Sequence, residues 1–332
     1  MTTPHLPKQP TETKEPITRL PSGRLDVYQT VTDRLIAALE AGVVPWVRPW
    51  TTAAPGEELP RPMPYNGYTR NPYAGINILL LWLTTTARGY RSSDWYTVRQ
   101  ANLSGAHVRK GEHGTLVTFW RTITVQDDAD TEDLPTEREV PLLRHYIVFN
   151  REQLEGLPAE AIADDRGQAG NSAVSGVAHR LDIVEQFVTR TGAVVIEHPT
   201  ACQPCYRTSV DRIFMPPLAR FTTHAAFYAT LLHEVAHWTG HERRLHRPMG
   251  GTFGTPSYAR EELTAEITSA FLCADFALPG DLQHPEYIGS WLQVLRDDNR
   301  AVFRAAREAR QAVAYLYALT ETPAAQVVEG AR

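Results

Sequence analysis

Apolar residues recur at three- and four-residue spacing in several segments of the chain, which is the pattern of amphipathic helices. The first of these segments starts near Leu25 and ends at Gly42. Further helices are predicted at 75–87, 95–102, 178–191, 224–241 and 258–276. The remaining C-terminal segments are rich in Ala and Arg and are also predicted to be helical.

Shorter runs rich in β-branched and aromatic residues predict strands. Residues 115–125 and 141–150 are expected to pair with each other, and the acidic run 127–133 (DDADTED) between them is expected to be a solvated hairpin loop. Two more short strands are predicted at 194–197 and 212–215. The helices and strands together predict an α+β protein.

The same patterns divide the chain into two domains, each long enough to bury a core of its own. The expected boundaries are a disordered tail 1–24, a small α/β domain 25–155, a linker 156–172, a second domain 173–320 and a tail 321–332. The N-terminus does not resemble a signal peptide, and the longest apolar run, Ile76–Leu83, is too short to cross a bilayer. We therefore expect a cytoplasmic protein without a membrane partner.

Composition narrows the classes of function. Hydrophobic residues make up 42% of the 332 residues and charged residues 21%, as in ordinary globular proteins. The net charge of −5 gives no overall basic signature, so any surface for nucleic acid must be local. Three cysteines at uneven positions do not form the framework of a disulfide-rich secreted protein.

A metal-binding pattern lies in the helix predicted at 224–241, where His233 and His237 are four residues apart. Residues at this spacing share one helix face, so both imidazoles can bind one cation. Glu234 is rotated off that face and is placed to accept a proton as a general base. Zinc, one ion per chain, is the expected metal because it lowers the pKa of a bound water to about 7; Mn²⁺ is the alternative.

A catalytic site of this type needs a third protein ligand. His241 lies ~12 Å along the helix axis from His233 and is too far away. Arg243 stands where a metzincin has a histidine, which excludes that class. Glu262, on the next predicted helix, is therefore the expected third ligand, and Glu266 is the expected carboxylate that orients a histidine. The reverse assignment, with Glu266 as the ligand, stays open.

Neighbouring polar residues have simpler interpretations. Glu261 is expected to be a solvated charge, and Tyr258 a packed residue at a helix start, although its hydroxyl could polarise a substrate carbonyl. Cys202 and Cys205 form a CxxC pair, but the chain has no second pair to complete a zinc site. We expect this segment to be a loop before the strand at 211–215, which would be the edge strand that pairs with an extended substrate.

The N-terminal half has a local nucleic-acid signature. Five of the seven tryptophans precede residue 121, and residues 88–121 contain six basic and two acidic side chains, a local charge of +4. Basic and aromatic residues together suit a groove for single-stranded nucleic acid, because cations neutralise phosphates and rings stack on unpaired bases. Trp82 is better explained as a core residue, whereas Tyr90, Trp95, Tyr96 and the turn Arg109-Lys110-Gly111 fit binding and packing equally.

Several longer segments together resemble ArdC-type antirestriction proteins of mobile elements. They are YNGYTRNPYAGINILLLW, GYRSSDWYTVRQANLSGAHVRKGEHGTLVTFW, YIVFNREQLEGLP, FYATLLHEVAHWTGHERRL and YAREELTAEITSAFLCADF, and they fall between about Leu25 and Ala318. The resemblance implies an N-terminal domain that binds single-stranded DNA and a C-terminal zincin-like metallopeptidase domain. It also implies His233, Glu234, His237 and Glu262 as site residues. The CQPC segment is not recognised as part of the family pattern.

The resemblance further implies a set of N-terminal motif residues, among which DNA contacts are expected. With Tyr96 added from the local pattern, the set is Asn66, Tyr73, Asn77, Trp95, Tyr96, Gln100, Arg109 and Lys110. The favoured function is a peptidase brought to an unknown protein substrate near single-stranded DNA. The alternatives are a DNA-shielding protein with a non-catalytic zincin domain, and a regulator-cleaving peptidase without DNA contact.

Overall fold

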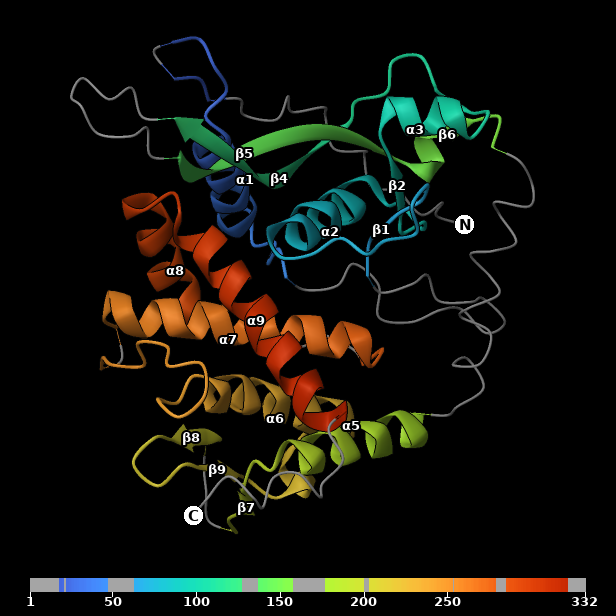
Figure 1. Cartoon of the computed structure of the whole chain (residues 1–332). Coiled ribbons are helices and arrows are strands. Elements are labelled where there is room, and N and C mark those ends of the chain that lie inside the picture. The colour runs from blue at the N-terminus through green and yellow to red at the C-terminus, as the bar shows by residue number, and fades with distance from the viewer. Residues whose placement is uncertain are drawn as a thin grey trace, which may run out of the picture.

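The computed structural model describes residues 18–20, 22–46, 63–126, 137–157, 177–199, 203–252, 254–278 and 285–321. A sheet with a long hairpin lies at one end of the molecule, and a group of packed helices with a small second sheet lies at the other (Figure 1). The expectation of a mixed α and β protein is confirmed. No helix in the described part of the chain is both long and apolar enough to cross a membrane.

The described residues of the N-terminal half form three helices and two small sheets. The helices are α1 (Val27–Glu40), α2 (Ile76–Arg88) and α3 (Val98–Leu103). The larger sheet has the order β1-β2-β5-β4, formed by β1 (Tyr65–Asn66), β2 (Asp94–Tyr96), β5 (Glu137–Asn150) and β4 (Thr115–Gln126). β3 (His107–Val108) pairs with β6 (Leu154–Glu155) in the second sheet, next to a 3₁₀ turn at Arg151–Gln153.

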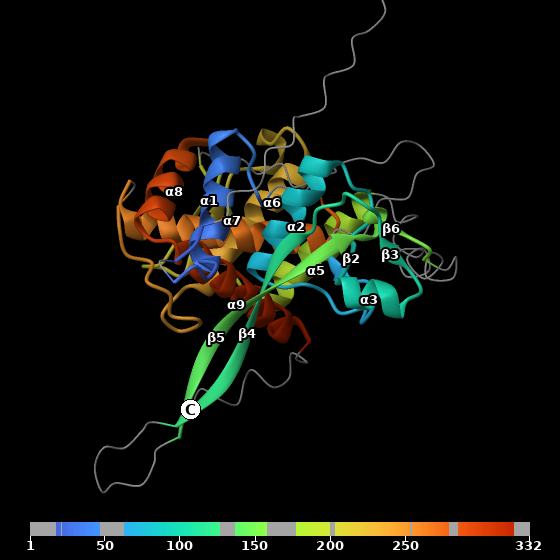
Figure 2. The same cartoon turned by 90° about the horizontal axis from the view of Figure 1, so that it is seen from above.

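The hairpin β4–β5 is the most extended feature of the molecule and points away from its body (Figure 2). Its two strands pair without interruption from Thr115 with Val148 to Gln126 with Glu137, which confirms the predicted pairing. The acidic run 127–133 that should connect them lies outside the described residues, as does most of the expected linker 156–172.

One predicted helix, 95–102, is wrong in its first part. Trp95 and Tyr96 belong to strand β2, and the helix α3 begins only at Val98. Thr97 separates the two elements: its side chain accepts a hydrogen bond from the backbone of Gln100, and the Gln100 side chain bonds back to the Thr97 backbone. This capping box starts a helix at the residue that follows it, a signal that the apolar spacing of the segment does not contain.

The C-terminal half begins with α5 (Val177–Thr191) and a three-stranded sheet of order β7-β9-β8, made of Val195–Glu197, Arg212–Met215 and Cys205–Arg207. A 3₁₀ turn at Leu218–Arg220 leads into α6 (His224–Thr239), which is followed by α7 (Pro256–Asp275), α8 (Pro285–Asp297) and α9 (Ala301–Glu321). Thr223 and Thr255 accept hydrogen bonds from the first turns of α6 and α7, and Pro256 is the first residue of α7. These are strong helix-start signals.

The largest hydrophobic cluster is shared by the two halves. It contains Leu35 of α1, Leu79 of α2, Leu263 of α7, Trp291 of α8 and Val302 of α9, all almost fully buried. A second cluster joins α5, α6, α7, α9 and strand β9. Helix α7 contributes to both clusters, so it lies at the centre of the molecule with the sheet end on one side and the metal-motif helix α6 on the other (Figure 1).

Candidate metal centre

Helix α6 presents its two motif histidines toward each other. The Nε2 atoms of His233 and His237 are 3.1 Å apart, and their rings are nearly perpendicular. His233 is buried, and the side chain of His237 is 12% exposed. Two ring nitrogens that face each other so closely cannot both carry a proton between them, so the arrangement suits a shared cation.

Helix α7 brings a carboxylate to the same point. Glu262 places Oε2 at 3.4 Å from His233 Nε2 and Oε1 at 3.6 Å from His237 Nε2. One donor atom from each of these three residues lies within 4.8 Å of the other two. Ligands about 2.0–2.1 Å from a tetrahedral zinc ion stand roughly 3.3–3.5 Å from one another. The spacing of the three residues therefore fits one small divalent cation.

The charges in this cluster favour proton transfer from carboxylate to imidazole. Burial alone would raise the pKa of Glu262, but hydrogen bonds from both histidines lower it. Burial opposes a charged His237, yet the carboxylates of Glu261 and Glu262 raise its pKa to about 10. A bound cation would take the place of these protons at the Nε2 atoms.

Glu261 is not the solvated charge that the sequence suggested. It is buried, and its Oε1 lies 3.1 Å from His237 Nδ1. Arg247, also buried, donates to both oxygens of this carboxylate at 2.6 and 2.9 Å. The same guanidinium donates to Ala236 O and Thr239 Oγ1 near the end of α6. Local spacing could not reveal the pair because Arg247 lies in the loop between α6 and α7.

Glu266, the carboxylate that the sequence predicts to orient a ligand histidine, is one turn further along α7 than Glu262. Its Oε1 is 3.9 Å from His233 Nδ1, and the residue is fully buried. Each histidine thus has a carboxylate on its Nδ1 side, at hydrogen-bond distance for His237 and beyond it for His233. His241 is not part of the donor group found among the described residues.

Glu234, the candidate general base, is held by a neighbouring strand. The backbone N–H of Tyr206 in β8 donates to Glu234 Oε2 at 2.6 Å. The Tyr206 hydroxyl donates to Asp211 at 2.7 Å, and Arg244 donates to Asp211 and stacks over the Trp238 ring at 3.9 Å. Hydrogen bonds from Arg244 are the main reason why the pKa of Asp211 falls to about 2. This network anchors β8 against α6.

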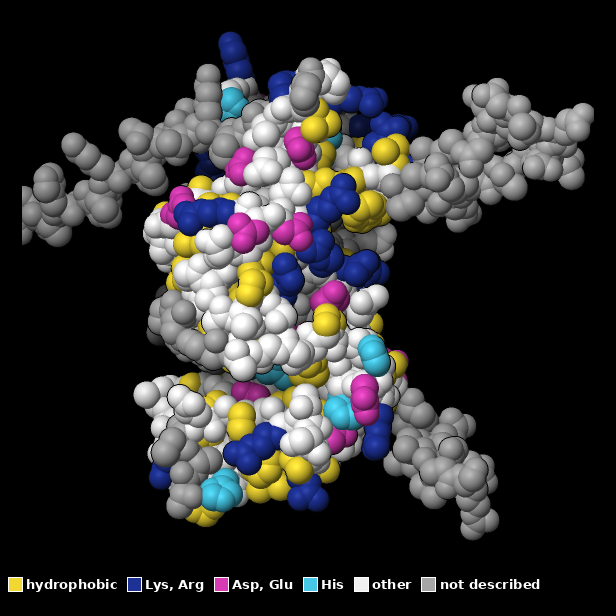
Figure 3. Space-filling model, turned by 90° about the vertical axis from the view of Figure 1, so that its left-hand side faces the viewer, with side chains coloured by type: hydrophobic (Ala, Val, Ile, Leu, Met, Phe, Trp, Pro, Cys, Tyr) yellow, Lys and Arg dark blue, Asp and Glu magenta, His cyan; other side chains and the backbone are white. Residues whose placement is uncertain are grey.

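The predicted edge strand needs correction. Strand β9 (Arg212–Met215) is the central strand of its sheet, and β8 (Cys205–Arg207) forms the edge that faces α6. Cys205, expected in a loop, is the first residue of this edge strand and is a partly exposed free thiol. Cys202 lies outside the described residues. A groove crosses the face of the molecule shown in Figure 3, with histidine and acidic side chains at its floor.

Tyr258 lies in the first turn of α7, the helix that also carries the carboxylates. Its hydroxyl is 3.1 Å from the hydroxyl of Tyr287 in α8, and it also hydrogen-bonds with Glu262. Burial is the main cause of its raised pKa, with Tyr287 and Glu262 adding to it. The phenol therefore stays protonated at neutral pH and acts as a neutral donor beside the candidate ligand.

Most of the N-terminal residues expected to contact DNA are engaged in the fold. Trp95 and Tyr96 are 0% and 2% exposed, so their rings cannot stack on bases. Asn66 accepts from the backbone of Tyr68 and Thr69 and donates to Gln100, which itself caps α3. These groups build the turn and the helix start that follow β1 and β2.

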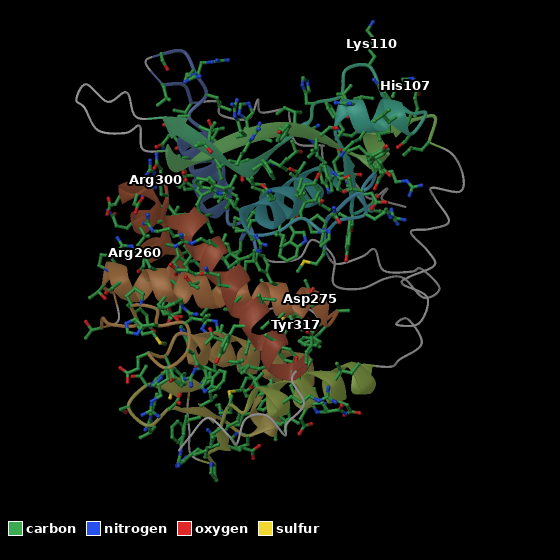
Figure 4. All side chains as sticks on the ribbon, viewed as in Figure 1. His107, Lys110, Arg260, Asp275, Arg300 and Tyr317 are labelled. Carbon is green, nitrogen blue, oxygen red and sulfur yellow. The ribbon has the colours of Figure 1, made fainter. Side chains whose placement is uncertain are left out.

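Asn77, Tyr73, Arg109 and Lys110 have different surroundings. The Asn77 amide donates to Thr118 O at 2.8 Å and accepts from Thr118 N at 2.7 Å, so it caps the outer edge of β4. Burial raises the pKa of Tyr73 to about 12, against a hydrogen bond with Asn66 that lowers it. Arg109 pairs with Glu112 at 2.8 Å. Lys110 extends outward at the tip of the molecule near His107 (Figure 4).

Among the described residues of this half, exposed aromatic side chains lie on the hairpin and at Tyr68, which is 48% exposed. Phe119, Trp120 and Tyr146 are 53%, 49% and 52% exposed, and Phe119 and Tyr146 contact each other edge to face. Arg121 and Arg144 are exposed on the same two strands. The sequence pattern did not single these rings out because a strand that is solvated on both faces has the same residue types as a half-buried one.

Two family models match the chain in succession. The N-terminal domain of anti-restriction factor ArdC matches residues 25–149, and a zincin-like metallopeptidase matches residues 182–308. A crystal structure of the metal-free antirestriction ArdC protein from plasmid R388 is 39% identical, with a TM-score of 0.72 over 89% of this chain and 98% of that one. The Mn(II)-bound form of that protein is 37% identical, with a TM-score of 0.71 over 90% and 99% of the two chains.

Sequence relatives extend the comparison. An uncharacterized protein of Sinorhizobium fredii is 38% identical over 319 residues, which cover 94% of this chain and 98% of the relative. The DNA primase TraC of Escherichia coli is 35% identical over 307 residues, but this region is 89% of the present chain and only 20% of the primase. The similarity to TraC therefore concerns one part of a much longer protein.

Proposed function

The chain belongs to the ArdC family of antirestriction proteins, and on this premise we propose that it is a metallopeptidase that binds single-stranded DNA. The N-terminal half holds the DNA, and the C-terminal half hydrolyses a peptide bond in a protein found near that DNA. The plasmid origin of the R388 relative and the similarity to TraC favour a role in the transfer of a mobile element.

The peptidase part is carried by one observation, the buried donor set of His233, His237 and Glu262 beside Glu234. These three side chains would hold a divalent cation, which would act as a Lewis acid toward a carbonyl and lower the pKa of water. The two imidazoles and one carboxylate suit zinc, and the Mn(II)-bound relative supports manganese as a second choice.

The remaining steps are done by side chains of this chain. Glu234 accepts the proton of the attacking water and later delivers it to the leaving amine. Strand β8 is the edge of its sheet next to Glu234. Its outward N–H at Tyr206 is bonded to Glu234, so an extended peptide would pair with the remaining carbonyl of this edge. The Tyr206 N–H fixes the position of Glu234 relative to this edge, so base and substrate backbone are held by the same strand.

The test of the peptidase is Glu234→Gln, which keeps the side-chain shape and removes the base. We expect zinc content to stay at the wild-type level while cleavage of a peptide library, read by mass spectrometry, falls by 10²-fold or more. Glu242→Gln, an exposed position just beyond α6, is the matched control. Equal cleavage by wild type and Glu234→Gln would show that this site does not hydrolyse peptides and would favour the DNA-shielding alternative.

The DNA-binding part rests on the exposed rings and arginines of the β4–β5 hairpin. Titration with a single-stranded oligonucleotide should quench tryptophan fluorescence, and binding should weaken steeply with salt. Trp120→Ala should weaken binding, since one stacked base contributes about 1–3 kcal/mol. Leu103→Ala, an exposed apolar position on α3, is the control. Absence of any oligonucleotide binding by wild type would favour a peptidase without DNA contact.

A further inference from the structure

A row of aromatic and basic side chains leads from the hairpin onto the C-terminal half. Trp120 of β4 contacts Tyr28 of α1, with ring centroids 6.3 Å apart. Arg300 lies just before α9. Its guanidinium stacks over the ring of Tyr28, 4.8 Å from the ring centroid. Phe303 of α9 supports Tyr28 from within the core at 4.9 Å. The exposed hairpin and the start of α9 are therefore linked through Tyr28 of α1.

The row continues along α9 to α7. Arg304, one turn after Arg300, pairs with Asp298, and Arg307 pairs with Glu308 at 3.9 Å. Arg260 of α7 is exposed. One turn further along α7, the Thr264 hydroxyl donates to Glu308 of α9 at 3.5 Å, so this part of α7 packs beside the row on α9. Arg260 immediately precedes Glu261 and Glu262, so the row ends on the helix that carries the candidate metal ligand.

The charge of this surface is positive in a protein whose net charge is −5. Arg304 pairs with Asp298 and Arg307 with Glu308, and the four arginines (260, 300, 304 and 307) outnumber the three acids of this surface, Asp297, Asp298 and Glu308, by one. Arg260 and Arg300 lie on the same side of the molecule (Figure 4). Figure 3, turned to show that side, has dark blue side chains gathered on the face above the groove.

We propose that single-stranded DNA bound on the hairpin continues over Tyr28 and Arg300 to Arg304 and Arg260, so that its path crosses from the N-terminal half to helix α7. The inference rests on the DNA binding proposed above and names the route of the strand. Rings at one end stack on bases, and guanidinium groups at the other neutralise phosphates. The bound strand then lies against the helix that holds Glu262, which places the peptidase next to DNA.

The route predicts that the arginines matter only for long strands. The double variant Arg260→Gln/Arg300→Gln should bind an oligonucleotide of about 20 nucleotides on the order of tenfold more weakly at low salt, and one of about 5 nucleotides as wild type does. The slope of log K against log salt should become shallower by about 1.4, since each lost phosphate contact on a single strand accounts for about 0.7. Arg190→Gln, at an exposed arginine near the end of α5, is the matched control.

A second measurement does not depend on how the variant folds. Wild-type protein is photo-crosslinked to a long oligonucleotide that carries a reactive base, and the attached peptides are identified. Crosslinks on 256–264 or 298–308 support the route. Crosslinks confined to the hairpin, or a double variant with wild-type affinity and salt slope for the long strand, overturn it and leave DNA binding by the hairpin intact. If wild type binds no oligonucleotide, the DNA-binding function fails and the route fails with it.

Discussion

The role of Glu261 can be tested by removing its charge while keeping its size, in Glu261→Gln. The carboxylate now accepts two hydrogen bonds from Arg247 and faces His237 Nδ1 at 3.1 Å. A glutamine has one acceptor oxygen, and its NH₂ group would be turned toward a second donor. At least one of these bonds is lost, and the buried Arg247 is left without a full counter-charge.

Two losses follow, one of unfolding free energy and one of metal affinity. A hydrogen bond between charged groups is worth about 1.5–3 kcal/mol, and a buried ion pair that loses one partner costs about 3–5 kcal/mol. Arg247 keeps its bonds to Ala236 and Thr239, so we expect the lower end, roughly 2–3 kcal/mol of unfolding free energy. Loss of a carboxylate that orients a ligand histidine lowers metal affinity by about 10–100-fold.

The assay is a zinc titration against a chromophoric chelator, together with denaturant unfolding in excess chelator. Glu266→Gln is the control, because this residue is equally buried and charged but its carboxylate is 3.9 Å from His233 Nδ1. It should reduce zinc affinity less than Glu261→Gln does. A folded Glu261→Gln protein with wild-type zinc affinity, or equal losses in the two variants, would refute the view that Glu261 positions His237.

Two further predictions concern groups outside the metal centre. Asn77→Ala removes the amide that caps both the N–H and the C=O of Thr118. We expect the unfolding free energy, measured with denaturant, to fall by about 1–3 kcal/mol while oligonucleotide affinity stays unchanged. A loss of oligonucleotide affinity without destabilisation would contradict this. Desolvation raises the pKa of Asp275 to about 6 from 3.8, against a hydrogen bond from Tyr317, so the folded state binds this proton more tightly and loses stability as pH rises from 4 to 6; the loss is small because the side chain is exposed and screened by solvent. Asp275→Asn should therefore be more stable than wild type above pH 6 and equal to it below pH 4, and parallel stability curves across this range would contradict the assignment.

Elements with strong local signals could be predicted from the sequence. Helices α1, α2, α5, α6 and α7 and the strands of the hairpin lie close to their expected positions because apolar spacing and capping residues are local properties. Strands β1, β3 and β6 were missed since they are two residues long. Such short strands exist only through their partners, and no local pattern marks them.

The candidate site also contains some features that local sequence predicts and others that depend on the complete fold. The spacing of His233 and His237 on one helix is a local property, and a carboxylate on the following helix is a short-range expectation. The contact between Glu261 and Arg247 depends on how the segment 240–252 after α6 folds back over the end of that helix, which no spacing rule describes. For the N-terminal half, residue type suggested stacking for Trp95, but burial, which decides whether a ring can stack, is a property of the complete fold.

The hydrophobic core shared by the two halves determines how the two proposed activities can be separated by experiment. Trp82 of α2 contacts Phe271 of α7 with ring centroids 6.0 Å apart, and both belong to the cluster that includes Leu35 and Leu263. A fragment that ends near Asn150 would expose the apolar side of α1 and α2 that α7, α8 and α9 cover, so its failure to act would report unfolding and not function. Point variants in the full chain avoid this problem. The same packing joins the N-terminal half to the helix that carries Glu262, so a ligand that moves α2 against α7 acts on the position of a candidate metal ligand.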